Sequence, residues 1–405
     1  MNIAVAQSGG PTAAINASLL GVVKEALMNN EIGTVYGAVN GIEGVINKNL
    51  IELNSLFSSE EADLLRQTPA TALGSCRYKL PSLDKDGEVY KKITDCFLEL
   101  EIKAFFYIGG NDSMDTVYKL SQYFSQNNID IKVMGVPKTI DNDLCETDHT
   151  PGFGSAAKFV ATAIKEISLD SAVYDLKSVT IVEIMGRHAG WLAASSCIPH
   201  ANGQLAPHLI YLPECEFSIE KFLQDVRRNL EKYNSVIVAV SEGIDLTSLD
   251  PTLRAGKVDA FGHQYLNGVG KCLENIVKDQ IGCKVRSVEL NVLQRAASHI
   301  SSLTDIDEAQ HIGACAVRAM LDGVTGKMMA FKRVSDNPYS VVVEAVDASL
   351  VANNERFFPK EWINDEQNNV KDEALAYFIP LIEGECALKT KNGLPVHFNI
   401  QNILK

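Results

Sequence analysis

The sequence predicts an α/β protein built on two mostly parallel sheets. A chain of 405 residues is longer than a domain with one ordinary hydrophobic core, which predicts about two or three domains. Apolar residues make up 46% and charged residues 22% of the chain, the balance of a globular protein with a large core. Short β-branched runs alternate with amphipathic stretches, a pattern typical of parallel strands joined by helices. We therefore expect two Rossmann-like domains with helices on both faces of each sheet.

The individual elements follow the chain in order. Runs of β-branched and aromatic residues predict strands at 2–7, 34–39, 104–108, 132–136, 178–184, 208–212, 236–241 and 284–290. Apolar residues at helical spacing predict helices at 13–28, 91–100, 113–124, 155–171, 219–232 and 306–321. From residue 347 onward the chain is polar and irregular, and we expect little chemistry there. Ligands of parallel sheets bind beyond the carboxyl ends of strands, so the residues after each strand are the candidates.

The charge balance restricts the possible binding partners, and the cysteines indicate the cellular compartment. A net charge of −14 disfavours nucleic acid and anionic membranes as partners, while local basic residues still allow an anionic small substrate. No apolar run approaches the roughly 18 residues that span a bilayer, and no basic n-region indicates a secretory signal. The nine cysteines are an odd number without a C-x-x-C pair, which favours reduced thiols in a cytoplasmic protein.

Glycine pairs follow two predicted strands and open the next helix. After the first strand comes S-G-G-P-T at 8–12, where Gly9 and Gly10 let the backbone approach a ligand and the helix start attracts an anion. Alone, this pattern equally fits an ordinary strand-to-helix turn. After the strand 104–108 comes G-G-N-D-S at 109–113, with polar groups suited to a phosphate or a metal. Two such turns on one sheet predict a phosphate site.

The densest polar cluster is P-K-T-I-D-N-D at 137–143, directly after the strand 132–136. Residues two apart in an extended segment project to the same side, so we expect Asp141 and Asp143 to share one pocket. Phosphoryl transfer to an alcohol needs a base for the hydroxyl and cations for the phosphate. Asp141 fits the base and Lys138 fits the cation. The alternative is an Asx-rich loop that only shapes the turn.

Charged residues also follow the later strands of this acidic chain. Arg187 lies in M-G-R-H-A-G-W at 185–191, where it and the next helix start fit a phosphate ester. Glu242 follows the strand 236–241 and fits sugar hydroxyls. Arg286 and Arg295 lie at the edge of the strand 284–290. Together these residues predict a site for a phosphorylated ligand.

Two nucleotide-binding motifs are set aside. The chain contains no G-x-x-x-x-G-K-[ST], which argues against a P-loop NTPase. Residues 152–157, G-F-G-S-A-A, match G-x-G-x-x-A but do not follow a strand, as a dinucleotide site requires.

Taken together, the motifs resemble the phosphofructokinase family. The S-G-G loop, the G-G-[DN]-D-S loop, P-K-T-I-D-N-D and M-G-R-H-A-G-W occur in the family's order between residues 8 and 295. The resemblance implies Mg²⁺-dependent phosphorylation of fructose 6-phosphate on its 1-hydroxyl, in a cleft between two domains of a homodimer or homotetramer. With it we assign a phosphoryl-donor domain to 1–139, a sugar-phosphate domain to 140–295, and to 296–405 a segment that packs on both.

The resemblance also implies roles for individual residues. Asp141 matches the family's proton acceptor, while Asn111 and Asp143 stand at the metal positions. Arg286 matches an arginine that reaches a neighbouring subunit's site. The residues implied at the pyrophosphate are Gly9, Gly10, Arg77, Gly110 and Lys138, and those implied at the sugar phosphate are Thr139, Ile140, Asp141, Met185, Gly186, Arg187, Glu242, Arg286 and Arg295.

Two residues bear on the phosphoryl donor. Members that use ATP carry a glycine at the position of Asp112, and they tend to carry a second glycine at the position of Lys138. A carboxylate about 4 Å from a phosphate of ATP repels it by on the order of 4 kcal/mol at an effective dielectric near 20. A lysine suits a small, dense anion better than a long nucleotide. Both positions predict the pyrophosphate-dependent branch, which works reversibly in glycolysis and gluconeogenesis.

Departures from the family pattern leave alternatives open. Asn111 replaces a commoner aspartate, so Mg²⁺ is expected to depend more on pyrophosphate, water and Asp143. Ser178 replaces an arginine that crosses a subunit interface, with Lys177 as a candidate substitute. The alternatives are the same reaction from ATP, a non-catalytic regulatory subunit, and a lipid or NAD kinase. Sedoheptulose 7-phosphate is a further acceptor that the sequence does not rank.

Overall fold

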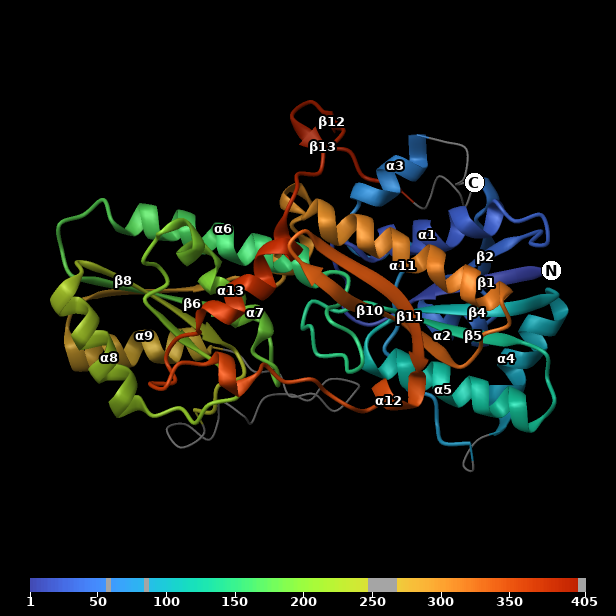
Figure 1. Cartoon of the computed structure of the whole chain (residues 1–405), viewed down its shortest axis with the longest axis horizontal. Coiled ribbons are helices and arrows are strands. Elements are labelled where there is room, and N and C mark those ends of the chain that lie inside the picture. The colour runs from blue at the N-terminus through green and yellow to red at the C-terminus, as the bar shows by residue number, and fades with distance from the viewer. Residues whose placement is uncertain (56–59, 84–86, 247–267, 400–405) are drawn as a thin grey trace.

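The computed structural model describes residues 1–55, 60–83, 87–246 and 268–399 (Figure 1). These residues form two large sheets and a short two-stranded ribbon. The first sheet has seven strands in the order β11-β10-β5-β4-β1-β2-β3, and the second has four in the order β7-β8-β6-β9. Parallel pairing dominates both sheets, which confirms the predicted α/β class.

The first sheet is parallel except at its two edges, where β3 and β11 run antiparallel to their neighbours. Its strands are β1 (Asn2–Gln7), β2 (Val35–Ala38), β3 (Leu50–Glu52), β4 (Ile102–Gly109), β5 (Lys132–Pro137), β10 (Lys327–Asp336) and β11 (Tyr339–Asp347).

Helices cover both faces of the first sheet, because side chains alternate along each strand. On β4, Phe106 and Ile108 face one layer of helices, while Phe105 and Tyr107 face the other. The first layer contains α1 (Ile15–Leu27), α3 (Glu60–Gln67) and α11 (Leu303–Leu321), and the second contains α2 (Gly41–Ile46), α4 (Gly87–Glu99) and α5 (Asn111–Gln126).

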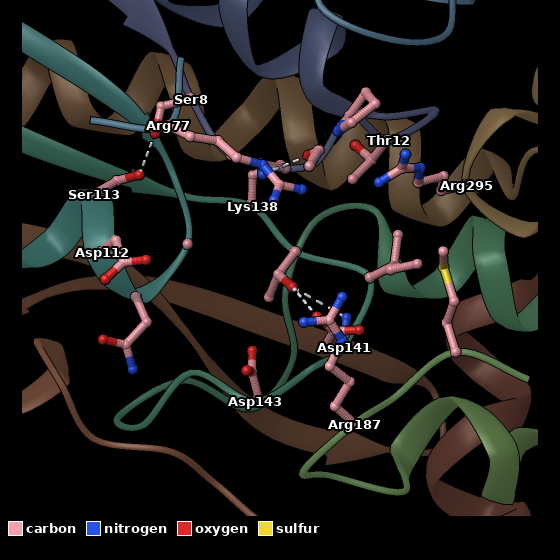
Figure 2. A pocket seen from close by; sticks show the side chains of 18 of the residues that line it. Ser8, Thr12, Arg77, Asp112, Ser113, Lys138, Asp141, Asp143, Arg187 and Arg295 are labelled. Carbon is pink, nitrogen blue, oxygen red and sulfur yellow. Dashed lines mark hydrogen bonds between the residues drawn. The ribbon is translucent and has the colours of Figure 1, made fainter. Parts of the chain in front are cut away.

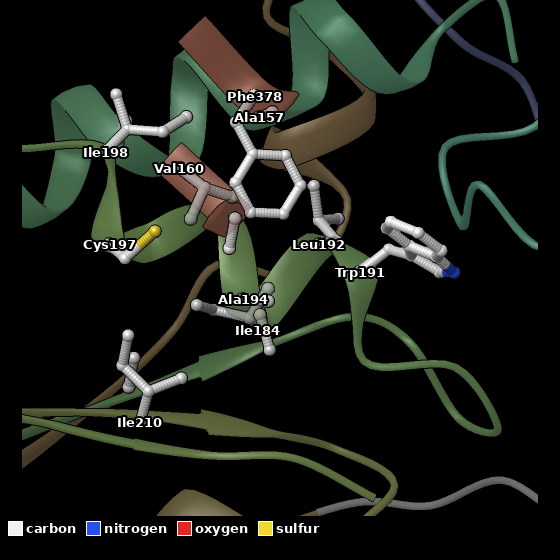
Figure 3. Close-up of a cluster of buried hydrophobic side chains, with 14 of the residues drawn as sticks. Ala157, Val160, Ile184, Trp191, Leu192, Ala194, Cys197, Ile198, Ile210 and Phe378 are labelled. Carbon is white, nitrogen blue, oxygen red and sulfur yellow. The ribbon is translucent and has the colours of Figure 1, made fainter. Parts of the chain in front are cut away.

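The second sheet is parallel throughout and is also covered on both faces. Its strands are β6 (Ser178–Ile184), β7 (Leu209–Tyr211), β8 (Ser235–Ser241) and β9 (Lys284–Glu289). One face packs on α6 (Phe153–Ser171), α7 (Trp191–Ala194), η2 (Ser195–Asn202) and α13 (Asp372–Phe378), and the other packs on α8 (Ile219–Lys232) and α9 (Val269–Ile281). Figure 3 shows Val160 of α6 and Phe378 of α13 above Ile184 and Ile210 of the sheet.

The chain after β9 visits both sheets. It passes through α10 (Leu293–Ala296) and η4 (Ser298–Ile300), then α11 packs along α1 and β10 extends the first sheet beside β5. After α12 (Ala348–Val351), it returns to the second sheet through η5 (Lys360–Trp362), α13 and η6 (Ile379–Ile382), and it ends in the ribbon of β12 (Thr390–Lys391) and β13 (Leu394–Pro395). This path agrees with a C-terminal segment on both halves, although the three domain boundaries stay a prediction.

All predicted strands and helices are present, with ends that differ by a few residues. The helices α2, α3 and α9, the strand β3 and the β10–β11 hairpin were not predicted, and the chain after residue 347 was expected to be irregular. That region forms short helices that bury few or no residues, and a ribbon that is largely exposed, so its composition stays polar. No helix in the described part of the chain combines the length and apolar character that a bilayer span requires.

Candidate active site

The loops after β1, β4, β5, β6 and β8 meet in a pocket lined from both sheets (Figure 2). Its cavity volume is about 280 Å³. Most residues predicted for the site line this cavity, namely Gly9, Gly10, Arg77, Gly110, Asn111, Asp112, Lys138, Thr139, Ile140, Asp141, Asp143, Met185, Arg187, Glu242 and Arg295. Gly186 and Arg286 do not line it.

The loop after β1 places the backbone of Gly9 and Gly10, which carry no side chains, next to two cations. Gly9 has a φ of +75°, a region that favours glycine. A Cβ at Gly9 would lie 3.3 Å from Nζ of Lys138, and one at Gly10 would lie 3.3 Å from Nη1 of Arg295. Nζ of Lys138 also donates a hydrogen bond of 2.7 Å to the carbonyl oxygen of Gly10. Two cations at this loop make it attractive to an anion.

The segment that carries Arg77 is held against the same loop. Asn16 is fully buried, and its Oδ1 accepts a 2.9 Å hydrogen bond from the backbone N–H of Ala72. Oγ of Ser75 donates a 2.7 Å hydrogen bond to the carbonyl oxygen of Gly9. These contacts place Arg77 at the pocket. The position of Arg77 in the sequence does not by itself explain this placement.

The loop after β4 delivers Asn111 and Asp112 in the first turn of α5. Oδ1 of Asn111 accepts a hydrogen bond from the backbone N–H of Asn353, and its Nδ2 donates to the carbonyl oxygen of Asn354. Both polar atoms of Asn111 therefore bind the C-terminal segment. Oδ1 of Asp112 lies 3.3 Å from Nζ of Lys79, a residue that sequence analysis did not select.

Lys138 and Asp141 form the charged centre of the loop after β5. Burial lowers the pKa of Lys138 to about 8, and the nearby Asp141 carboxylate opposes this shift. Burial raises the pKa of Asp141, while Lys138 and Arg187 oppose the rise. The backbone N–H of Asp141 donates a 3.1 Å hydrogen bond to Oγ1 of Thr139, which holds the turn. A carboxylate with a raised pKa is a stronger base than an exposed one.

Two further carboxyl groups in the pocket have raised pKa values. Burial, then Asp141 and Glu355, raise the pKa of Asp143 to about 7. Burial and then Asp141 raise the pKa of Glu242 to about 7, and Arg187 opposes this rise. Nε of Arg187 lies 3.8 Å from Oε1 of Glu242. A bound ligand that supplies positive charge or hydrogen-bond donors would therefore stabilise the charged form of these carboxyl groups.

Gly186 contributes to the pocket although it does not line it. Its backbone N–H donates a 3.4 Å hydrogen bond to Oε1 of Glu242. Gly186 has a φ of +128°, and a Cβ there would lie 2.6 Å from the carbonyl oxygen of Ala189. The glycine is thus required for the turn that presents Arg187.

The polar C-terminal stretch supplies one residue that lines the pocket and one that holds a pocket loop, and neither was predicted from the sequence. Glu355 lines the cavity, and its Oε1 lies 3.0 Å from Nδ1 of His188. Arg356 donates to the backbone carbonyl oxygens of Asn142 at 3.0 Å and Thr147 at 2.8 Å, which holds the loop after β5. Isolated charged residues in an irregular stretch carry no periodic or motif signal, so the sequence offered no means of finding them.

Arg286 lies on the edge strand β9, away from the pocket. Its Nη1 lies 3.4 Å from Oδ2 of Asp170, and the side chain is about half exposed. The expectation that it reaches a neighbouring subunit stays a prediction.

The pocket offers few side chains of its own as ligands for Mg²⁺. Within the described ranges, no group of three or more His, Cys, Asp or Glu side chains is arranged to hold a metal ion. Mg²⁺ at phosphoryl-transfer sites is commonly held by one or two carboxylates together with substrate oxygens and water. Asp143 fits that requirement, and it does so better than Asn111, whose amide binds the backbone of 353–354.

Known proteins resemble this chain over nearly its full length. The family model described as Phosphofructokinase matches residues 2–320. A pyrophosphate–fructose 6-phosphate 1-phosphotransferase of Halomonas elongata is 41% identical over 397 residues, covering 97% of this chain and 94% of the relative. A relative of the same name from Xanthomonas campestris pv. campestris is 40% identical over 406 residues, covering 99% and 96%. The crystal structure of a pyrophosphate-dependent phosphofructokinase from Marinobacter aquaeolei has a TM-score of 0.87 at 38% identity, covering 98% of this chain and 95% of that one. This chain therefore belongs to the phosphofructokinase family.

Proposed function

We propose that this chain transfers a phosphoryl group reversibly between pyrophosphate and the 1-hydroxyl of fructose 6-phosphate. The observation that carries the proposal is the cavity in which Asp112, Lys138 and Asp141 meet, since these residues combine donor selection with the chemistry. The names of the similar proteins from three bacteria support the same donor.

The donor end of the pocket is assigned to pyrophosphate. The ammonium group of Lys138 and the guanidinium group of Arg77 supply positive charge, and the bare backbone of Gly9 and Gly10 allows close approach. Lys138 is already oriented by its bond to Gly10, so little conformational entropy is lost when pyrophosphate binds. Asp112 supplies a negative charge at the position where ATP would carry a further phosphate.

The acceptor end is assigned to the sugar phosphate. Arg187 and Arg295 supply cations for the 6-phosphate, and Glu242 accepts hydrogen bonds from sugar hydroxyls. Asp141 accepts the proton of the 1-hydroxyl as the sugar oxygen attacks the nearer phosphorus atom. The bond from that phosphorus to the bridging oxygen breaks, and orthophosphate leaves. In the reverse direction, protonated Asp141 returns the proton to the sugar oxygen.

Mg²⁺ is proposed as the cofactor, with Asp143 as its protein ligand. When bound, such an ion neutralises the charge that develops on the phosphate oxygens. Asp143 holds its position because its carbonyl oxygen accepts a 2.7 Å hydrogen bond from the backbone N–H of Arg356.

A homodimer or homotetramer is part of the same proposal. Exposed apolar side chains gather at the end of α6 and just after it, at Leu169, Val173, Tyr174 and Leu176, and this patch adjoins Arg286 on β9. Analytical ultracentrifugation tests the assembly, and a monomer at assay concentration would contradict it. The cytoplasmic location expected from the sequence also stays a prediction.

A coupled assay tests the reaction. Fructose 6-phosphate and Mg²⁺ are supplied with either pyrophosphate or ATP, and fructose 1,6-bisphosphate is detected through aldolase and a dehydrogenase. Turnover with pyrophosphate and a far lower rate with ATP is the expected result. Faster turnover with ATP would overturn the donor assignment, and no turnover with either would favour a regulatory subunit. Sedoheptulose 7-phosphate replaces the sugar in a parallel assay to define the acceptor range.

A further inference from the structure

Asp112 creates an electrostatic problem at the donor end of the pocket. Its carboxylate lines the cavity and is 38% exposed, so it faces the space proposed for pyrophosphate. A lone carboxylate repels pyrophosphate by the same Coulomb interaction with which it repels ATP. Selection between the two donors therefore requires a cation that offsets the charge of Asp112 when the smaller donor binds.

Lys79 is placed to supply that cation. It lies two residues after Arg77, and its Nζ is 3.3 Å from Oδ1 of Asp112. Lys138 is a weaker candidate for this role, because it is buried and its Nζ already binds the carbonyl oxygen of Gly10. Figure 2 shows Asp112 and Arg295 at opposite ends of the view, so Arg295 does not serve Asp112.

The surrounding contacts orient the Lys79 side chain. Its Nζ also lies 3.4 Å from Oδ1 of Asn353, to which it donates a second hydrogen bond. Nδ2 of Asn353 donates to Oδ1 of Asp115 at 3.1 Å, and Oδ2 of Asp115 lies 2.6 Å from Nζ of Lys119. Three segments far apart in the sequence thus hold the ammonium group over Asp112.

We propose that Lys79 is the counter-charge of Asp112, and that the Lys79–Asp112 pair forms the end of the donor site that accepts pyrophosphate and rejects a nucleotide. This inference rests on the proposed function, in which Asp112 selects the donor. Lys79 acts through Asp112 and is a positioning residue rather than a catalytic one. Without this lysine, Asp112 would weaken the binding of pyrophosphate as well as that of a nucleotide.

The first test replaces Lys79 with methionine, which keeps most of the stem and removes the charge. We expect KM for pyrophosphate to rise about threefold to fivefold, the upper range for a partly exposed ion pair, while kcat and KM for fructose 6-phosphate stay unchanged. Lys79→Arg should restore most of the affinity. The matched control is Lys92→Met, which removes the charge of another half-exposed lysine that pairs with Glu88 at 3.0 Å, outside the pocket.

The second test is a double-mutant cycle with Asp112→Asn. If the role of Lys79 is to offset Asp112, the double variant Lys79→Met/Asp112→Asn regains the KM for pyrophosphate that Lys79→Met lost. Calorimetric titration with pyrophosphate measures the same cycle without turnover. A Lys79→Met variant that matches the Lys92→Met control overturns the inference, and so does a double variant no better than Lys79→Met. Assays of the unchanged enzyme test the proposed function separately. If the unchanged enzyme fails to use pyrophosphate, that result refutes the proposed function and not the pairing of Lys79 with Asp112.

Discussion

Replacing His149 with glutamine is expected to destabilise the protein most below about pH 6.5 and little at high pH. His149 is buried, and its ring nitrogens face two carboxylates, with Nδ1 at 2.8 Å from Asp148 and Nε2 at 2.7 Å from Glu308. The ring stacks on Phe331 with centroids 4.6 Å apart. His149 thereby fastens the loop that follows β5, which carries Asp141, to α11 and β10.

The pKa of His149 sets the size of the effect. Burial disfavours the charged ring, but the carboxylates of Glu308 and Asp148 outweigh burial and raise the pKa of His149 to about 9 from 6.5. This difference corresponds to about 3 kcal/mol of stability. Because the folded pKa is the higher one, the contribution is complete below pH 6.5 and is lost as pH rises through 9.

Urea denaturation at several pH values between 6 and 10 measures the contribution. Tryptophan fluorescence is a suitable signal, because both tryptophans of the chain, Trp191 and Trp362, pack against Tyr377 beside this loop. The stability difference between the unchanged protein and His149→Gln should be largest near pH 6 and shrink toward pH 10. His311→Gln, an exposed histidine on α11, is the control. A difference that is constant with pH, or that grows with it, would refute the assignment of an imidazolium at this site.

Three further predictions concern the reaction itself. Asp141→Asn should lower kcat by at least about a hundredfold, the scale of general-base loss, and a near-normal rate in the coupled assay would remove Asp141 from that role. Because the pKa of Lys138 is lowered to about 8, its cation is lost above that pH, and kcat/KM for pyrophosphate should fall about tenfold per pH unit there. Lys138→Arg, which stays charged, should remove this break, and a break that persists in the variant would assign it to another group. Asp112→Gly, alone or with Lys138→Gly, should raise the use of ATP, and an ATP affinity that stays unmeasurable in both variants would show that another feature blocks the nucleotide.

The strand ends and their loops could be predicted because they depend on local rules. β-branched runs mark β1, β4 and β5. Gly9, with a φ of +75°, is needed for the turn after β1, and Gly109, where a Cβ would lie 2.0 Å from Oγ of Ser113, is needed for the turn after β4. The order of these motifs also identified the family, and it placed Lys138 and Asp141 in the loop that lines the pocket. The spacing of residues along the chain was sufficient for these conclusions, since each motif lies within a few residues.

The contacts between distant segments were decided only by the tertiary structure. Glu355 and Arg356 come from a stretch without periodicity, yet the first lines the pocket and the second holds the loop after β5. The role proposed for Lys79 is indicated only by its contact with Asp112, which lies on another element. The raised pKa of Asp141 and the lowered pKa of Lys138 follow from burial beneath both halves of the molecule. A sequence records which groups exist, whereas the dielectric and the charges around each group depend on how distant segments pack.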